Sequence, residues 1–303
     1  MFDLICLGHA ALDRVYSIAA FPPEPTKLRA TQAMEVGGGM AATAAVAAAR
    51  LGGRVAFWGR VGDDAAGAAV RDGLVAEGID VRGLRTCQGA VTSTSAVIVD
   101  AAGERMIVTH LGEGLDDDPA GLPWPMLAQA RAVLVDVRWP AGSLALLRAA
   151  RAAGVPGVLD VEMMAGAALA ELLDATDHAV FSRPGLAEFA PGLPEPDGLA
   201  KARAAGAAVP GVTQGEHGYL WLDPAGRARR QPAFAVRAVD TTGAGDAFHG
   251  AYALGVARGL EVADCARQGA GAAALKCTRP GTRAGLPDGA ALSAFLAERA
   301  AAV

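Results

Sequence analysis

The second half of the chain alternates short β-branched segments with longer helix-forming segments, and this alternation strongly constrains the fold. From about Arg131 the predicted strands are residues 132–135, 155–159, 178–181 and 207–212, and predicted helices include residues 141–153 and 166–173. The strand segments are apolar on both faces, as in parallel sheets covered by helices on both sides. We therefore expect an α/β three-layer sandwich with a mostly parallel central sheet. Ligands of such sheets bind beyond the carboxyl ends of the strands.

Two segments break the alternation and predict a small second sheet. Residues 15–18 with 28–36, and residues 95–99 with 105–109, have period-two patterning without a helix between the partners. The second pair turns at Asp100-Ala101-Ala102-Gly103, which is a good hairpin signal. We interpret these strands as an antiparallel β lid inserted into one domain, residues 1–303, in two segments at about 14–36 and 92–111. Ordinary edge strands are the alternative; a lid is favoured because sites that exclude water commonly carry such covers.

Composition excludes several classes of protein. The chain has 303 residues with 27 basic and 32 acidic side chains, which gives no long-range attraction to nucleic acid or anionic membrane. The longest apolar run, Ala41–Ala49, is too short to cross a bilayer. The first residues enter a strand-like run without a basic segment, so we expect no export signal. Four scattered cysteines, without a CxxC pair, are typical of reduced thiols. We expect a soluble cytoplasmic protein.

The segment Asp240-Thr241-Thr242-Gly243-Ala244-Gly245-Asp246 carries the strongest chemical signal, and a helix-forming run, 247–258, follows it. Glycines at a helix start let backbone N–H groups point together at an anion, and the helix dipole adds positive potential. A carboxylate there would repel a simply bound phosphate. It is suited to taking a proton from an attacking hydroxyl while the amides stabilise a transferring phosphoryl group. A glycine-rich helix cap is the alternative.

A second glycine motif, Gly37-Gly38-Gly39-Met40-Ala41-Ala42-Thr43, leads into a predicted helix over residues 44–51. Triple glycine before a helix exposes backbone amides and removes side-chain bulk, so a polar ligand can approach the main chain. The alternative is a tight turn packed under the lid, and the motif alone is a weak signal.

Together the two motifs resemble the ribokinase/PfkB family of carbohydrate kinases over essentially the whole chain. Residues 240–246 are similar to the C-terminal signature of that family and residues 38–52 to its N-terminal signature. Val61-Gly62-Asp63-Asp64 with Gly67, and Val212-Thr213-Gln214-Gly215 with Gly218, resemble further family segments. The chain has no GxxxxGK[ST] loop, so a P-loop kinase is not supported.

The resemblance implies a role for each matching residue. Asp246 would be the catalytic base, and Asp13 would accept hydrogen bonds from sugar hydroxyls; a turn or capping role is the alternative for Asp13. The remaining implied sites are the anion hole (Gly243, Ala244, Gly245), substrate contacts (Gly38, Gly39, Thr43), nucleotide contacts (Thr213, Gly215, Gly218, Thr241, Gly243, Gly245) and a monovalent-cation site (Asp240, Thr242, with carbonyls near Arg279 and Gly281). The implied cofactors are ATP, Mg²⁺ and K⁺.

Two departures from the family pattern affect these expectations. Thr43 stands where the family often has Asn, which puts direct contact between this side chain and the sugar in doubt. The Asn-x-x-Glu segment of the family, which helps to order magnesium waters, is Ser182-Arg183-Pro184-Gly185 here. We therefore expect Mg²⁺ to be held mainly by nucleotide phosphates and water.

Longer runs resemble the sulfofructose kinases, a subfamily that phosphorylates 6-deoxy-6-sulfofructose. These runs are residues 35–39 through 51–52, 136–139 and 274–281. By this resemblance Lys27 and Arg138 would bind the sulfonate. A solvated lysine, and an arginine stacked beside Trp139, are the alternatives. Thr109 replaces an asparagine of the subfamily pattern, which leaves a sugar phosphate such as fructose 6-phosphate as a rival substrate.

The sequence therefore predicts an ATP-dependent sugar kinase with 6-deoxy-6-sulfofructose as the favoured substrate. The rivals are a kinase of the same fold acting on fructose, ribose, 2-keto-3-deoxygluconate or fructose 6-phosphate, and a regulator that binds nucleotide or sugar without turnover. We expect small-molecule ligands, neither nucleic acid nor membrane, and a homodimer formed through the lid.

Overall fold

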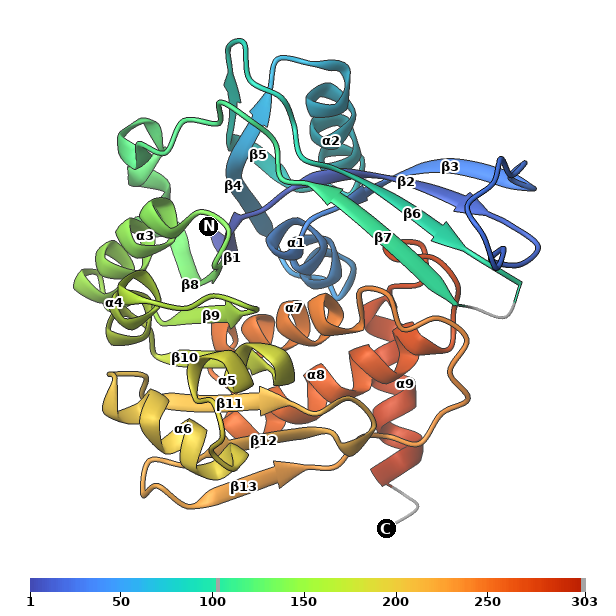
Figure 1. Cartoon of the computed structure of the whole chain (residues 1–303). Helices are drawn as coiled ribbons and strands as arrows, with labels where there is room; N and C mark the ends of the chain where they lie inside the picture. The colour runs from blue at the N-terminus through green and yellow to red at the C-terminus, as the bar shows by residue number, and fades with distance from the viewer. Residues whose placement is uncertain (102–103, 301–303) are drawn as a thin grey trace.

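The main sheet places the carboxyl ends of its parallel strands at one edge, beside the N-termini of two central helices. In the computed structural model, which describes residues 1–101 and 104–300, nine strands follow the order β13-β12-β11-β10-β9-β8-β1-β4-β5 (Figure 1). Neighbours from β11 to β5 pair in parallel, whereas β12 and β13 are antiparallel. This arrangement confirms the predicted α/β sandwich with a mostly parallel sheet.

The main-sheet strands are β1 (Phe2–Gly8), β4 (Val55–Gly62), β5 (Asp80–Cys87), β8 (Ala130–Asp136), β9 (Gly157–Val161), β10 (His178–Ser182), β11 (Val209–Thr213), β12 (Tyr219–Leu222) and β13 (Ala228–Gln231). The helices are α1 (Met40–Arg50), α2 (Ala65–Ala76), α3 (Pro140–Ala152), α4 (Ala167–Ala175), α5 (Arg183–Phe189), α6 (Glu195–Ala204), α7 (Ala244–Ala257), α8 (Val262–Cys277) and α9 (Gly289–Ala300). Short 3₁₀ turns lie at Pro119–Gly121, Trp124–Gln129 and Gly215–His217.

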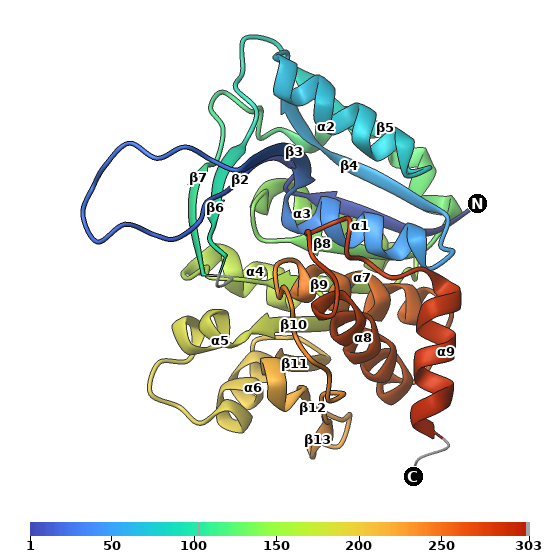
Figure 2. The same cartoon turned by 90° about the vertical axis from the view of Figure 1, so that its right-hand side faces the viewer.

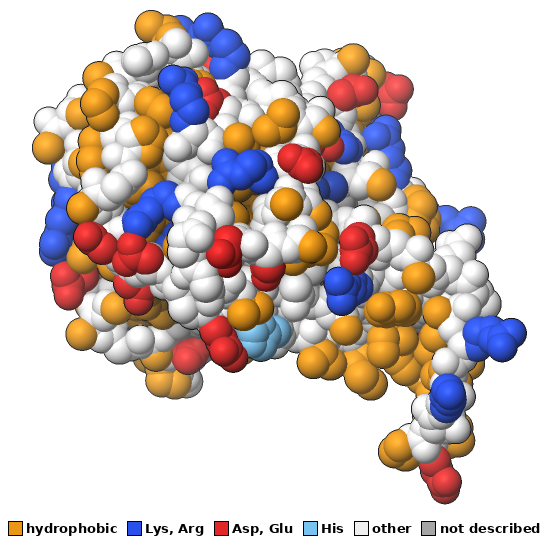
Figure 3. All heavy atoms as spheres, turned by 90° about the horizontal axis from the view of Figure 1, so that it is seen from above, with side chains coloured by type: hydrophobic (Ala, Val, Ile, Leu, Met, Phe, Trp, Pro, Cys, Tyr) orange, Lys and Arg blue, Asp and Glu red, His pale blue; other side chains and the backbone are white. Residues whose placement is uncertain are grey.

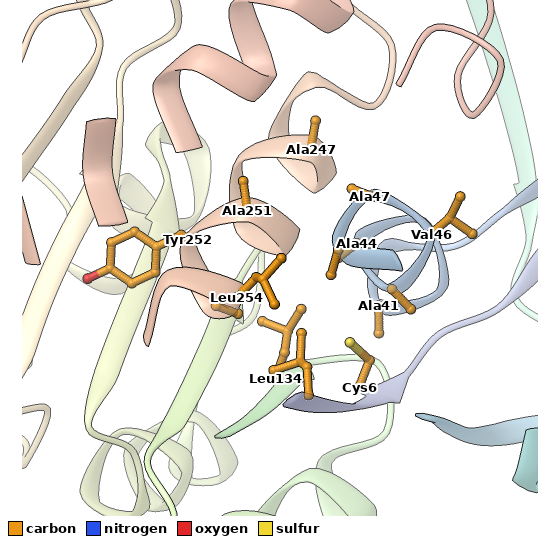
Figure 4. Packing of buried hydrophobic residues seen from close by; sticks show 14 of the residues in the cluster. Cys6, Ala41, Ala44, Val46, Ala47, Leu134, Ala247, Ala251, Tyr252 and Leu254 are labelled. Carbon is orange, nitrogen blue, oxygen red and sulfur yellow. The ribbon is translucent and has the colours of Figure 1, made fainter. Parts of the chain in front are cut away.

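Helices cover both faces of this sheet. Side chains of α1, α2, α7 and α8 share one buried cluster, and those of α3, α4, α5 and α6 share the other, on the opposite face (Figure 2). The seam between α1 and α7 is built from small residues, with Ala44 and Ala47 facing Ala247 and Ala251 (Figure 4). A Cβ at Gly250 would overlap the Ala44 carbonyl, so this glycine allows the two helices to approach closely.

A second, four-stranded sheet stands apart from the main one. It consists of β2 (Ala11–Ser17), β3 (Gln32–Gly38), β6 (Thr94–Val99) and β7 (Arg105–His110), in the order β3-β2-β6-β7. Two antiparallel hairpins, β2–β3 and β6–β7, are joined through parallel pairing of β2 with β6. The segment between β2 and β3 projects away from the body (Figure 2). We call these four strands the small sheet; part of the predicted hairpin turn, Ala102 and Gly103, lies outside the described residues.

Both glycine-led helices begin earlier than predicted. Helix α1 starts at Met40 rather than Ala44, and α7 starts at Ala244 rather than Ala247. Gly39 and Gly243 precede them with φ of 89° and 78°, values that glycine adopts readily, so each helix begins directly after its glycine. Asp246 consequently lies within the first turn of α7. No helix in the described residues is long and apolar enough to cross a membrane.

Candidate active site

The loop before α7 presents unpaired amides at a helix N-terminus. The Ala247 N–H donates to the Gly243 carbonyl at 2.9 Å, and the Ala244 N–H donates to the Thr241 carbonyl at 3.2 Å. Within the described residues the N–H groups of Gly243 and Gly245 have no hydrogen-bond partner. These two amides, at the positive end of the helix dipole, form a nest that can bind an anion. The Ala244 amide, which was also predicted to belong to the anion hole, is instead paired with the Thr241 carbonyl.

The Asp246 carboxyl is suited to exchange a proton near neutral pH. Burial raises its pKa to about 7; the Arg283 guanidinium opposes that rise, while the carboxylates of Asp136, Asp13 and Glu162 add to it. A base with a pKa near the working pH is the most effective in general base catalysis. The geometry thus combines a proton acceptor with a nest for a developing negative charge.

Each glycine of the second motif makes room for a particular group. A Cβ at Gly37 would overlap the Arg283 guanidinium, and a Cβ at Gly38 would overlap the Asp13 carboxylate. Gly39 lies against the His9 carbonyl, and its φ of 89° favours glycine. The space cleared by the first two glycines therefore holds side chains of this chain, whereas the sequence predicted room for a ligand.

Arg283 connects the two carboxylates that the sequence singled out. Its side chain is 7% exposed, and Nη2 donates to the Gly38 carbonyl at 2.9 Å. Burial lowers the pKa of Arg283 to about 10, and the negative charges of Asp13 and Asp246 oppose that shift. The guanidinium remains charged at neutral pH and attracts both carboxylates.

Asp13 belongs to a polar row across the small sheet. The register aligns Asp13 of β2 with Ser95 of β6 and Thr109 of β7, so the three side chains share one face. Ser95 hydrogen-bonds to Asp13, and the Ser95 and Thr109 hydroxyl oxygens are 3.3 Å apart. Burial raises the pKa of Asp13, although the Ser95 hydrogen bond and the charges of Arg283 and His9 oppose this. The row faces the same site as Asp246.

Several buried polar atoms around Asp13 lack partners. Thr43 is 1% exposed, and its hydroxyl has no hydrogen bond to any described residue; the same holds for His9 Nε2 and Arg283 Nε. Buried polar groups are nearly always hydrogen-bonded, so atoms of this kind suggest that a polar ligand completes the site.

Arg138 follows β8 at its carboxyl end, as the sequence predicted, but Lys27 does not join it. Arg138 is exposed and lines a pocket with His9 and Arg60, while Trp139 is buried and stacks under Arg60 at 4.4 Å. Lys27 is exposed in the projecting segment between β2 and β3 (Figure 2), and no contact in the described part of the chain links it to Arg138. The predicted pair is therefore not brought together in this structure.

The predicted nucleotide residues lie at the end of β11 and in the loop before α7 and its first turn. Thr213 ends β11 and donates its hydroxyl to the Phe181 carbonyl at 3.2 Å, and Gly215 adopts φ of 58°. Gly218 has φ of 93°, and a Cβ there would overlap the Gln231 carbonyl, so its own role is to let β13 approach. Thr241 accepts a hydrogen bond at 3.2 Å from Arg105 of the small sheet.

The structure reveals acidic and histidine residues that the sequence analysis missed. Glu162 follows β9, accepts a hydrogen bond from Ser182 at 2.8 Å and raises the pKa of Asp246. Asp160 lies within β9, two residues earlier, and its Oδ1 is 3.3 Å from Nε2 of His249 on α7. Burial raises the pKa of Asp160 well above its usual value and lowers that of His249 to about 4. Their carboxyl-end positions on a parallel strand were the available signal for Asp160 and Glu162.

Through its carboxylate, Asp136 joins three backbone segments at the edge of the main sheet. Its buried carboxylate accepts hydrogen bonds from the backbone N–H groups of His9 at 2.7 Å, Ala41 at 3.1 Å and Arg138 at 2.8 Å. The ends of β1 and β8 and the start of α1 are fixed to one another through this group, which orients the site without entering it.

The predicted monovalent-cation residues surround a side chain of the protein itself. Asp240 Oδ1 accepts from the Thr242 N–H, and Oδ2 accepts from the Gly281 N–H, both at 2.8 Å. The Lys276 ammonium, which is 0% exposed, donates to the Asp240 carbonyl at 2.8 Å and to the Arg279 carbonyl at 3.3 Å. These oxygens therefore do not fit an added K⁺ ion while Lys276 is in place.

For Mg²⁺ the described residues offer no group of three or more His, Cys, Asp or Glu side chains arranged to hold a metal. Glu162 and Asp246 are single carboxylates, close enough for the charge of Glu162 to raise the pKa of Asp246. This donor set fits a metal that nucleotide phosphates and water mainly coordinate.

Comparison with known proteins gives the class of protein. The model of the pfkB family carbohydrate kinases matches residues 1–289. A crystal structure from Agrobacterium tumefaciens, provisionally called a ribokinase, has a TM-score of 0.92 and 35% identity, covering 98% of this chain and 97% of the other. The structure of Arabidopsis thaliana ribokinase complexed with ribose and ATP has a TM-score of 0.87 and 26% identity, with 97% and 98% coverage. Haemophilus influenzae ribokinase is 29% identical over 294 residues, covering 94% of this chain and 95% of that protein.

The chain therefore belongs to the pfkB family of carbohydrate kinases, and it is an enzyme. The expected family resemblance is confirmed, and a regulator without turnover is disfavoured. The closer resemblance to sulfofructose kinases is not shown, because the relatives compared above are named ribokinases.

Proposed function

We propose that this kinase transfers the γ-phosphoryl group of ATP to the primary hydroxyl of 6-deoxy-6-sulfofructose, giving 6-deoxy-6-sulfofructose 1-phosphate in sulfoquinovose degradation. The choice of substrate rests on Arg138, whose exposed guanidinium lines a pocket beside His9. A fixed anion on the far end of a sugar from Asp246 would meet this charge-assisted donor.

Asp246 would act as the general base. Its pKa of about 7 leaves a substantial fraction ionised at neutral pH, ready to take the proton of the attacking hydroxyl. The amides of Gly243 and Gly245, at the positive end of α7, would bind the negative charge of the transferring group. Mg²⁺ carried by ATP would neutralise charge on the phosphates.

The sugar would lie between the small sheet and the start of α7. Asp13 would accept hydrogen bonds from sugar hydroxyls, and the unpartnered hydroxyl of Thr43 would gain a partner. Thr109, in register with Ser95 beside Asp13, would donate to an oxygen of the anion. The small sheet would then serve as a lid that keeps water from the phosphoryl group.

Nucleotide would bind along the ends of β10 and β11. Thr213 and Gly215 would contact the phosphates, and Thr241 would lie beside the anion nest. The four free thiols suit an enzyme of the reducing cytoplasm.

Ribose is the second candidate, because the similar proteins are named ribokinases and one of their structures contains ribose and ATP. A neutral pentose would leave Arg138 without an anionic partner. Fructose, 2-keto-3-deoxygluconate and fructose 6-phosphate are further acceptors to be compared in the same assay.

The test is an ADP-release assay with ATP and Mg²⁺ on each of these sugars. We expect kcat/KM to be highest for 6-deoxy-6-sulfofructose. Replacing Arg138 by alanine should lower that value about 10- to 100-fold, since hydrogen bonds to charged groups contribute about 1.5–3 kcal/mol, while turnover of fructose changes little.

Arg131→Ala is the matched control, because Arg131 lies at the opposite end of the same strand and is exposed. An equal loss for fructose and the sulfonate sugar would show that Arg138 has a structural role. A higher kcat/KM for ribose would replace the proposed substrate and keep the role of Asp246.

A further inference from the structure

Lys276 is a fully buried lysine whose ammonium lies among oxygen atoms. It belongs to the last turn of α8, at 0% exposure, although lysine is almost never fully buried unless it is paired. Its Nζ donates to the carbonyls of Asp240 and Arg279 at 2.8 and 3.3 Å and lies 3.3 Å from Asp240 Oδ2. Two carbonyls and one carboxylate thus surround a single positive charge.

These oxygens belong to Asp240 and Arg279, two of the four residues around which the sequence analysis placed a monovalent cation. Main-chain carbonyls and a carboxylate are hard oxygen donors that suit an alkali ion. An ammonium group has three donors and no acceptor, so it satisfies the same oxygens with the same charge. The buried Lys276 side chain therefore competes directly with a dissociable cation for this place.

The position of Lys276 links it to the phosphate nest. Asp240 is three residues before Gly243, and its carboxylate also accepts N–H groups of Thr242 and Gly281. The N–H groups of Val239 and Asp240 donate to the Cys277 carbonyl at the end of α8. The charge of Lys276 thus holds the loop before α7 against the end of α8.

We infer that Lys276 is a built-in substitute for the monovalent cation, so that the phosphate nest is ordered and the kinase turns over without K⁺. This inference rests on the proposed kinase site, yet it concerns a cation requirement and not the identity of the sugar. Lys276 is a positioning residue: it acts through the loop that carries the nest, without touching substrate.

The first experiment uses the wild-type protein and separates the inference from the choice of sugar. The melting temperature, and ADP release with whichever sugar turns over, are measured in potassium, sodium and choline chloride at equal ionic strength. We expect all three salts to give the same values. A potassium-specific rise in either quantity overturns the inference, and the melting measurement decides even where no sugar is turned over.

The second experiment removes the ammonium. Lys276→Ala leaves the Asp240 and Arg279 oxygens without a positive charge. We expect turnover in choline chloride to fall at least about tenfold, since a rise of about 1.4 kcal/mol in the activation free energy is enough for that loss. Potassium or ammonium ions should restore part of this turnover and raise the melting temperature of the variant above its value in choline chloride.

Lys201→Ala is the control, because Lys201 also donates to a carbonyl, that of Phe189, but at an exposed place on α6. It should show no salt specificity. A Lys276→Ala protein that folds but responds equally to potassium and choline overturns the substitution; if the variant does not fold, the wild-type experiment decides.

Discussion

At the scale of single residues, the chemistry depends on how a few charged groups share one buried region. Asp246 and Asp13 are drawn toward their neutral forms by burial, and Arg283 draws both back toward the ionised form. The environment therefore keeps the proposed base near its midpoint at neutral pH, where it both accepts and releases a proton readily.

This balance predicts the pH dependence of turnover. Asp246 must be ionised to accept a proton, so kcat/KM should fall by about tenfold per pH unit below 7 and level off above it. Asp246→Asn should lower turnover by about 10²–10⁴-fold, since proton transfer by a positioned group contributes that range, and should abolish the acid limb. Initial rates across pH, at sugar concentrations well below KM, give the profile.

The matching control is Asp264→Asn, a change in the first turn of α8 that should leave the profile as in the wild type. An unchanged acid limb in the Asp246→Asn enzyme would mean that another group controls the pH dependence.

Sequence reasoning identified the residues that lie inside local motifs. Asp246 stands in a glycine-rich helix start. Asp13 was expected in the loop after the first strand, but it lies within β2. Arg283 was missed because its hydrogen bond to Gly38 joins residues 245 positions apart, and no local sequence pattern predicts a contact of that kind. Lys276 lies in the run 274–281 that resembles the sulfofructose kinases, but its role was not predicted. The contact between its side chain and the Asp240 carbonyl depends on how the end of α8 packs against the loop before α7.

At the scale of elements, strand and helix types followed from periodicity, whereas helix starts and strand partners did not. The alternating segments of the second half became β8, α3, β9, α4, β10 and β11. The starts of α1 and α7 were placed too late because residues 40–43 and 244–246 were assigned to the glycine-rich loops, although each helix begins directly after Gly39 or Gly243. The parallel pairing of β2 with β6 joins two distant hairpins, and a register of this kind is a tertiary property.

The small sheet contacts the loop before α7 through one strand. Arg105 of β7 donates to the Thr242 hydroxyl at 2.8 Å and to the Thr241 hydroxyl at 3.2 Å. Arg105 is in register with Val99 and Ser17, which places it on the same face as Asp13. A movement of this sheet would therefore also move Thr241 and Thr242 in the loop before α7.

We expect Arg105→Ala to weaken ATP binding more than sugar binding. Two hydrogen bonds of about 0.5–0.7 kcal/mol each, at the low end for a partly exposed place, would raise KM for ATP roughly five- to tenfold, with kcat changed little. Arg14→Ala is the control, because Arg14 lies in the same sheet on the opposite face and pairs with Glu35 at 3.0 Å. A change in the KM of the sugar alone would contradict this role for Arg105.

At the scale of the whole molecule, the site forms where two sheets meet. The main sheet supplies its carboxyl edge through Asp136 and the segment after β9, and the small sheet supplies Asp13. Neither sheet contains the whole site, so under the proposed function the position of the small sheet would determine whether the sugar meets Asp246. The opposite face of that sheet is free of proposed catalytic residues.

That opposite face predicts a homodimer. The register places Tyr16, Ile98 and Met106 side by side, with Val108 next to them, and Met106 and Val108 are 51% and 61% exposed. Apolar side chains gather on the small sheet beside the projecting segment (Figure 3). An exposed apolar group of this kind, bordered by the Arg14–Glu35 ion pair, is typical of an interaction site, and a two-fold axis would bury it against its own copy. We therefore expect a dimer by sedimentation velocity and a monomer for Val108→Lys.

Val75→Lys is the control for this prediction. Val75 is similarly exposed, at 54%, but it lies on α2 outside this face, so its replacement should leave the dimer intact. A wild-type protein that sediments as a monomer would contradict the proposed dimer.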